Sequence, residues 1–126
     1  MERIFLALVG LLYAGLAAWC TISPKITSNK VGFDLQPGSG ESEFVTVYGG
    51  LEMGMALIFL LPLLSKDSTS FALLACLLMH LCLVVFRSYS FMVFSGIGRM
   101  TYQLAVGEWV ILLLSLVLYF WPRSAS

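Results

Sequence analysis

Long apolar segments alternate with polar ones along this chain, and the pattern predicts an all-α integral membrane bundle. A helix needs about 20 residues to cross a hydrocarbon core of about 30 Å. Four segments come close to that length, so we expect a single domain of four transmembrane helices. Their predicted ranges are residues 4–23, 44–64, 71–88 and 100–121.

The connections between these segments differ in character. Residues 24–43 are predicted to form a polar loop, since breakers such as Gly32 and Pro37 recur in them. A tight polar turn at residues 65–70 joins the second helix to the third. Residues 89–98 are too short to span a membrane and too apolar for a water-facing loop. Because backbone in lipid must be covered by protein, we expect a re-entrant or interfacial segment there.

The composition indicates a membrane protein and argues against nucleic acid as a partner. Of its 126 residues, 60% are hydrophobic and 11% are charged, and the mean hydropathy is +0.94. Soluble domains carry about 25% charged residues, so a water-soluble core is excluded. The formal net charge is zero, which argues against nucleic acid, because such binding needs a basic face. The lipid bilayer is the expected partner.

The first apolar segment has some features of a signal peptide. Arg3 precedes an apolar run that is followed by Ala17 and Ala18. Against cleavage, Glu2 offsets the charge of Arg3, and the run is nearer the length of a full span than of a signal sequence. We therefore interpret it as the first transmembrane helix.

Charged residues inside the predicted helices are the main functional clue. A charged side chain at the bilayer centre costs about 2.5–3.5 kcal/mol on insertion scales, so Glu52 and Glu108 require compensation. At a rise of about 1.5 Å per residue, both lie in the half of the bilayer that faces the long loop. Arg87 and Arg99 are predicted on the same side. Arg87 is a suitable partner for either glutamate, because a guanidinium can bind a carboxylate through two hydrogen bonds.

Two further residues join the predicted cluster. Tyr48 lies one helical turn before Glu52, and His80 shares a helix face with Arg87, seven residues away. No catalytic residue can be identified by motif. The ligand-binding candidates are therefore Glu52, Glu108, Arg87, Arg99, Tyr48 and His80.

Neither a metal nor a cofactor is expected. His80 is the only histidine, so the chain cannot supply two histidines to a haem or a His-rich di-iron site. The nearby arginines would repel a cation. The three cysteines Cys20, Cys76 and Cys82 form no CxxC pair, and we interpret them as small packing residues.

Small residues recur at four-residue spacing, as in closely packed membrane helices. They are Gly10, Ala14 and Ala18 in the first segment and Gly50 and Gly54 in the second. These stripes fit packing within one chain and equally fit a homo-oligomer. The basic residues outside the cluster are Arg3, Lys66 and Arg123 on the side of the termini, against Lys25 and Lys30 on the other. This count favours cytoplasmic N- and C-termini.

The chain resembles a bacterial family of four-helix membrane proteins of unknown function, close to the DoxX-like group. The matching stretches are residues 47–54, Val-Tyr-Gly-Gly-Leu-Glu-Met-Gly, and residues 87–98, together with Gly107-Glu108-Trp109. This resemblance implies a bacterial inner-membrane location and a four-helix bundle, and it implies no activity. Members often carry a basic residue shortly before the Tyr-Gly-Gly, where this chain has Glu43 and Thr46.

Three functional hypotheses and one structural alternative follow. The protein binds a small amphipathic or lipid-like molecule at the Glu/Arg cluster, or it is an accessory or assembly subunit of a larger membrane complex. Alternatively it is a membrane enzyme that uses Glu52 or Glu108 as a general acid or base. The buried charges can also serve only to fix the register and topology of the helices.

Overall fold

The computed structural model describes residues 1–121, and within that range it contains helices and no strand. Four continuous helical segments are long and apolar enough to cross a membrane: Glu2–Ile22, Ser39–Leu64, Lys66–Val93 and Arg99–Phe120. The prediction of four such helices is confirmed. In chain order the elements are α1 (Glu2–Ile22), α2 (Pro24–Lys30), α3 (Ser39–Phe44), η1 (Val45–Leu51), α4 (Glu52–Leu64), η2 (Lys66–Ser68), α5 (Thr69–Val93) and α6 (Arg99–Phe120).

The segment predicted as a polar loop, residues 24–43, is partly helical. Pro24 does not simply end α1: it occupies the first turn of α2, where its fixed φ suits a helix and its missing N–H costs nothing. The second span begins at Ser39, five residues before the predicted start at residue 44. Lys25 and Glu41 form an ion pair of 3.4 Å between α2 and α3, which links the two short helices.

The re-entrant or interfacial segment predicted at residues 89–98 is not confirmed, and the connection between the third and fourth spans is shorter than predicted. Residues 89–93 continue α5, since no glycine or proline interrupts them, and only Phe94–Gly98 separates α5 from α6. The chain reverses there with Gly96 at a φ of 74°. Only glycine adopts that left-handed conformation without steric cost.

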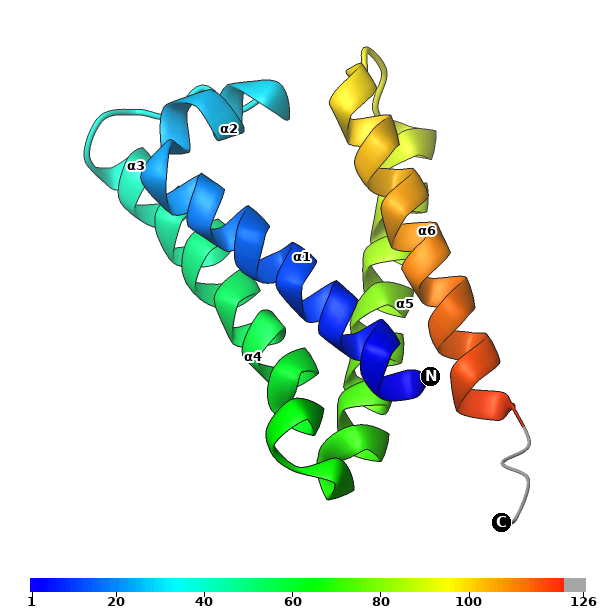
Figure 1. The fold of residues 1–126 in the computed structure, drawn as a ribbon. Helices are drawn as coiled ribbons and strands as arrows, with labels where there is room; N and C mark the ends of the chain where they lie inside the picture. The colour runs from blue at the N-terminus through cyan, green and yellow to red at the C-terminus, as the bar shows by residue number, and fades with distance from the viewer. Residues whose placement is uncertain (122–126) are drawn as a thin grey trace.

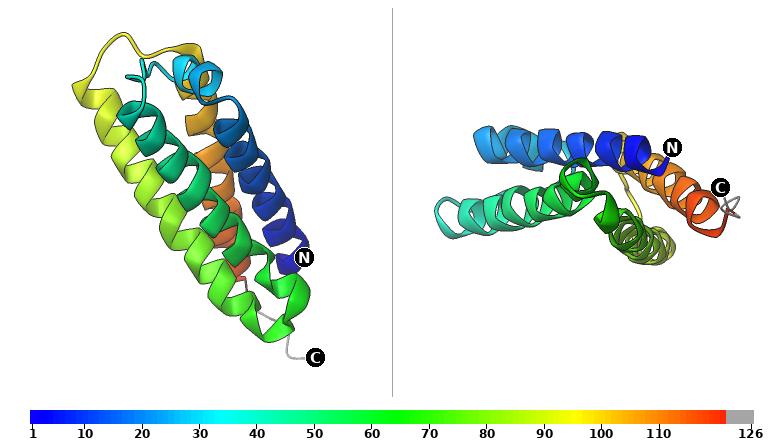
Figure 2. Two further views of the ribbon diagram at one scale, coloured as in Figure 1. Left: turned by 90° about the vertical axis from the view of Figure 1, so that its left-hand side faces the viewer. Right: turned by 60° about the horizontal axis from the view of Figure 1, so that its bottom comes forward.

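The helices pack as two antiparallel pairs. α1 lies along η1 and α4, and α5 lies along α6, as both views of the bundle show (Figures 1 and 2). The two pairs meet through contacts of α5 with α4 and α1, and they diverge toward the end that carries α2 (Figure 1). The N-terminus, the η2 turn and the end of α6 lie together at the opposite end (Figure 1).

The core lies where the two pairs meet. Its largest fully buried side chains include Leu6, Phe59 and Leu73, from α1, α4 and α5. Most other large apolar side chains are exposed, for example Leu51, Leu57 and Phe86, at 63%, 60% and 73%. An apolar outer surface of this extent suits a lipid environment and would be unusual in water.

The two predicted stripes of small residues have different surroundings. A Cβ added to Gly10 would lie 2.7 Å from Cγ of Leu60, so this glycine lets α1 approach α4 closely. A Cβ on Gly49 would collide with Oγ1 of Thr21 on α1. Gly50 and Gly54, by contrast, have open space where a Cβ would point. Only the glycines facing α1 or α4 contribute to packing within the described bundle.

Candidate functional site

Arg87 on α5 and Glu108 on α6 form a two-pronged ion pair. Nε of Arg87 donates to Oε2 of Glu108 at 3.0 Å, and an Nη atom donates to Oε1 at 2.5 Å. The pair is largely shielded, with exposed side-chain fractions of 27% for Arg87 and 12% for Glu108. Of the two partners that the sequence allowed for Arg87, the structure selects Glu108. Both charges are thereby compensated inside the α5/α6 pair.

Glu52 is separate from that ion pair. Its Oε2 atom is buried and has no hydrogen-bond partner in the structure of residues 1–121. Because the second span begins at Ser39, Glu52 lies within about 1 Å of the midpoint of this continuous helix. A buried carboxylate oxygen without a partner is rare in proteins and costs free energy in either protonation state. Glu52 is therefore the uncompensated group of the predicted cluster.

The backbone before Glu52 is unusual. Residues Val45–Leu51 form a π-helix, η1, which passes directly into α4 at Glu52. π-Helical turns are rare and frequently occur at functional sites. The stretch includes Gly49 and Gly50, which give the backbone the freedom to adopt a wide turn. This local distortion could not be read from the apolar pattern, because α- and π-helices use the same residue types.

Tyr48 belongs to an aromatic cluster beside Glu52. Its ring stacks on Phe44 with ring centroids 4.6 Å apart, and Phe33 meets it edge-on at 5.8 Å. Phe33 comes from the connection between α2 and α3. Tyr48 is half-buried and lies within electrostatic range of both Glu52 and Arg87. The cluster thus packs the connection between α2 and α3 against the helical turn that precedes Glu52.

His80 is fully buried and joins the two helix pairs through Tyr13. Its Nδ1 atom lies 2.8 Å from the carbonyl oxygen of Cys76, which can only accept, so Nδ1 carries the proton of the neutral ring. Nε2 then accepts from the hydroxyl of Tyr13 at 2.9 Å. This bond connects α1 with α5.

The same polar chain continues to α6. Sγ of Cys76 lies 3.5 Å from the hydroxyl oxygen of Ser115, and that hydroxyl donates to the carbonyl of Ile111 at 2.7 Å. Cys76 is therefore more than the small packing residue predicted from the sequence. The chain of contacts Tyr13–His80–Cys76–Ser115 ties α1, α5 and α6 together in the core.

Tyr13 was not predicted as a site residue, yet it contacts one of the candidates, His80, directly. Its hydroxyl lies within electrostatic range of Glu52, Arg87 and Glu108. In the sequence, Tyr13 looks like one more apolar residue of the first span, and nothing local indicates that it faces a histidine 67 residues away. The signal that could have found it is its helical spacing from Leu6, Val9 and Ala17, which places it on the face of α1 that the structure buries.

Arg99 does not join the other candidates. It is the first residue of α6 and is exposed, about 13 Å along the helix from Glu108. Across residues 1–121 it forms no ion pair. In the same range, no group of three or more His, Cys, Asp or Glu residues is placed to hold a metal ion.

Comparison of the chain with protein-family models, with curated proteins and with solved structures finds no match. None of these comparisons supports the resemblance to the DoxX-like group, which rests on the short sequence stretches at Glu52, Arg87 and Glu108 alone.

Proposed function

We propose that this protein binds a small amphipathic or lipid-like molecule within its helical bundle, with Glu52 as the polar anchor. The observation that carries the proposal is the buried Oε2 atom of Glu52, which lacks a partner within residues 1–121. Leaving such a group unsatisfied costs free energy. A ligand that donates a hydrogen bond to this oxygen would recover that cost.

The electrostatics favour a ligand with a cationic or hydrogen-bond-donating head. A carboxylate only accepts hydrogen bonds, and the nearby Arg87 is already bound by both oxygens of Glu108. An ammonium group or a hydroxyl on the ligand would supply what the chain does not. The aromatic rings of Tyr48 and its neighbours offer an apolar contact for the rest of the molecule.

Glu52→Gln tests the proposal, with Glu43→Gln as the matched control. Glu43 is exposed and lies on the same continuous span. The measurement is native mass spectrometry after release in mild detergent, combined with titration of a cationic fluorescent amphiphile. We expect a retained small molecule, or saturable amphiphile binding, in the unmodified protein and in Glu43→Gln but not in Glu52→Gln. Equal binding by all three would show that Glu52 is not the anchor.

An accessory or assembly role in a larger membrane complex is the second candidate. Its support is the pair Gly50 and Gly54, which lie four residues apart with open space beside them. That spacing lets another helix approach closely, whether from a different protein or from a second copy. A co-purifying chain that is lost when Gly54 is replaced by Leu would favour this role over ligand binding.

Of the two glutamates considered as a general acid or base, only Glu52 remains suited to an enzymatic role. Glu108 is held by Arg87 through both carboxylate oxygens, whereas Glu52 has an oxygen without a partner in the described range. A membrane enzyme built on this chain would use Glu52 as its general base or acid.

We also propose a multi-pass location in a bacterial inner membrane, with cytoplasmic termini. Arg3 and Lys66 support this orientation, because they gather at the end that holds the N-terminus and the η2 turn. At the other end Lys25 is paired with Glu41, whereas Lys30 and the exposed Arg99 form no ion pair within residues 1–121 and count against this orientation. Arg123, the third basic residue counted for this side, lies outside the described residues.

A further inference from the structure

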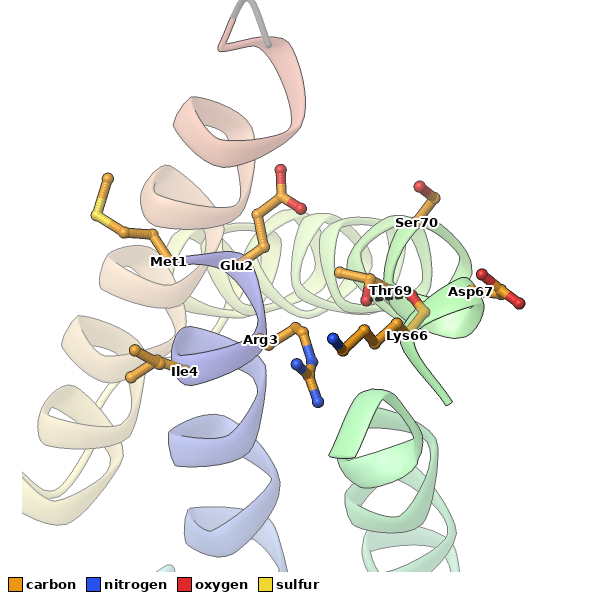
Figure 3. Close-up of a pocket in the computed structure, with 8 residues that line it drawn as sticks. All are labelled: Met1, Glu2, Arg3, Ile4, Lys66, Asp67, Thr69 and Ser70. Carbon is orange, nitrogen blue, oxygen red and sulfur yellow. Dashed lines mark hydrogen bonds between the residues drawn. The ribbon is translucent and has the colours of Figure 1, made fainter. Parts of the chain in front are cut away.

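A pocket of about 800 Å³ opens at the end of the bundle opposite α2. It is lined by the first turn of α1 and by the start of the third span, and it contains none of the candidates around Glu52 (Figure 3). The lining residues are Met1, Glu2, Arg3, Ile4, Lys66, Asp67, Thr69 and Ser70. The α1 span and the third span both begin here, so the pocket lies where the hydrocarbon of the bilayer gives way to the headgroups.

We propose that this pocket binds the phosphate group of an anionic amphiphile through Arg3 and Lys66. The two cationic side chains approach each other from different helices (Figure 3). In the part of the chain that the structure describes, neither forms an ion pair with a carboxylate. Two neighbouring positive charges repel unless an anion lies between them.

The Arg3 side chain is held in place for such a contact. Its Nε atom donates to the carbonyl oxygen of Pro62, near the end of α4, at 2.9 Å. The terminal amino groups of the guanidinium remain for a ligand, and they match the spacing of phosphate oxygens. Lys66 contributes a flexible point charge from the η2 turn, and the positive end of the α5 helix dipole adds to the potential there.

The two acidic residues of the pocket do not neutralise these cations. The carboxylates of Glu2 and Asp67 point away from Arg3 and Lys66 (Figure 3). Ile4 lines the same pocket and is 68% exposed, so an acyl chain can lie against α1 while the phosphate meets the cations. This combination of charge and apolar contact favours a phospholipid over a free phosphate ion.

Native mass spectrometry of the purified full chain with added phosphatidylglycerol tests the proposal. Phosphatidylcholine serves as the zwitterionic comparison, and the variants are Lys66→Gln and the double variant Arg3→Gln/Lys66→Gln. Arg99→Gln is the control, since Arg99 is an exposed arginine outside this pocket. We expect phosphatidylglycerol affinity to fall about fivefold for each basic side chain removed. The affinity of Arg99→Gln should stay unchanged.

Lys66→Gln keeps the experiment interpretable if the double variant fails to fold, because Lys66 is exposed and the Arg3–Pro62 bond stays intact. If millimolar inorganic phosphate displaces phosphatidylglycerol and is itself retained in the mass spectrum, the phosphate site is supported and its ligand is a soluble ion. Equal retention of phosphatidylglycerol by the unmodified protein and Lys66→Gln overturns the proposal. So does equal affinity for the two lipids.

Discussion

Arg87 binds both carboxylate oxygens of Glu108, and this contact joins α5 to α6. Removing one member of a shielded pair leaves the other charge without compensation, which costs about 3–5 kcal/mol for fully buried pairs. Because Arg87 and Glu108 are partly exposed, we expect about 2–3 kcal/mol for Arg87→Ala or Glu108→Ala. Equilibrium unfolding in mixed detergent micelles measures this loss.

The double variant Arg87→Ala/Glu108→Ala tests whether the two residues act as a pair. Its destabilisation should be much smaller than the sum of the two single losses, because it leaves no unpaired charge. Additive losses would mean that each residue has a separate partner.

Replacing Glu52 should raise the stability of the protein, whereas replacing Arg87 or Glu108 should lower it. Replacing it by Met removes a buried oxygen that has no partner in residues 1–121, and Met has a similar volume. We expect the ligand-free protein to gain about 1–2 kcal/mol. Thermal unfolding in detergent, followed by circular dichroism, measures the change. A loss of stability in Glu52→Met would indicate that the carboxylate has a structural partner and would argue against its role as a ligand anchor.

Tyr13→Phe removes the hydroxyl that binds Nε2 of His80. The imidazole then keeps its bond to the Cys76 carbonyl but has a buried acceptor without a donor. We expect a loss of about 1–3 kcal/mol in unfolding free energy. The nitrogen-15 resonance of His80 Nε2 should also shift, which a purely packing role of the tyrosine would not produce. Tyr102→Phe is the control, since Tyr102 is 51% exposed.

The glycines allow a matched packing test. Gly10→Ala places a Cβ 2.7 Å from Cγ of Leu60 and 3.2 Å from the Ala56 carbonyl oxygen, so the Leu60 side chain or α1 itself must shift. We expect a loss of about 1–3 kcal/mol, as for other overpacked positions. Gly54→Ala meets nothing within 4 Å and should be neutral or stabilising by up to about 1 kcal/mol in the monomer. Equal effects of both variants would contradict the described packing of α1 on α4.

The helical architecture could be predicted because membrane spans depend mainly on length and apolar content, which are local properties of the sequence. The boundaries were less predictable. Pro24 can end one helix or begin the next. The contacts of Lys25 with Glu41 and of Phe33 with Tyr48 show that the polar segment folds back on the second span. Residues 89–93 extend α5 because no breaker precedes Gly96.

The charged residues of the candidate site could be predicted from the sequence, but the contacts that they form could not. Helical spacing indicates that Arg87 can reach a glutamate, but choosing Glu108 over Glu52 requires knowing that α5 packs on α6. Tyr13 and Ser115 contact His80 and Cys76 across helix interfaces. Such pairings depend on the rotation of each helix about its axis, and residue spacing within one helix does not determine them between helices.

The π-helix before Glu52 gives this span one residue more than a regular α-helix of the same length would hold. A π-helical stretch accommodates more residues per turn than an α-helix does. Deleting Gly50 from Val45–Leu51 would let the stretch fold as a regular α-helix, while α4 keeps its packing on α1. Because the wide turns already absorb the extra residue, the segment before the deletion would keep its orientation about the helix axis to within about 30°. The Phe44–Tyr48 stack would therefore stay beside Glu52 although the span had lost a residue.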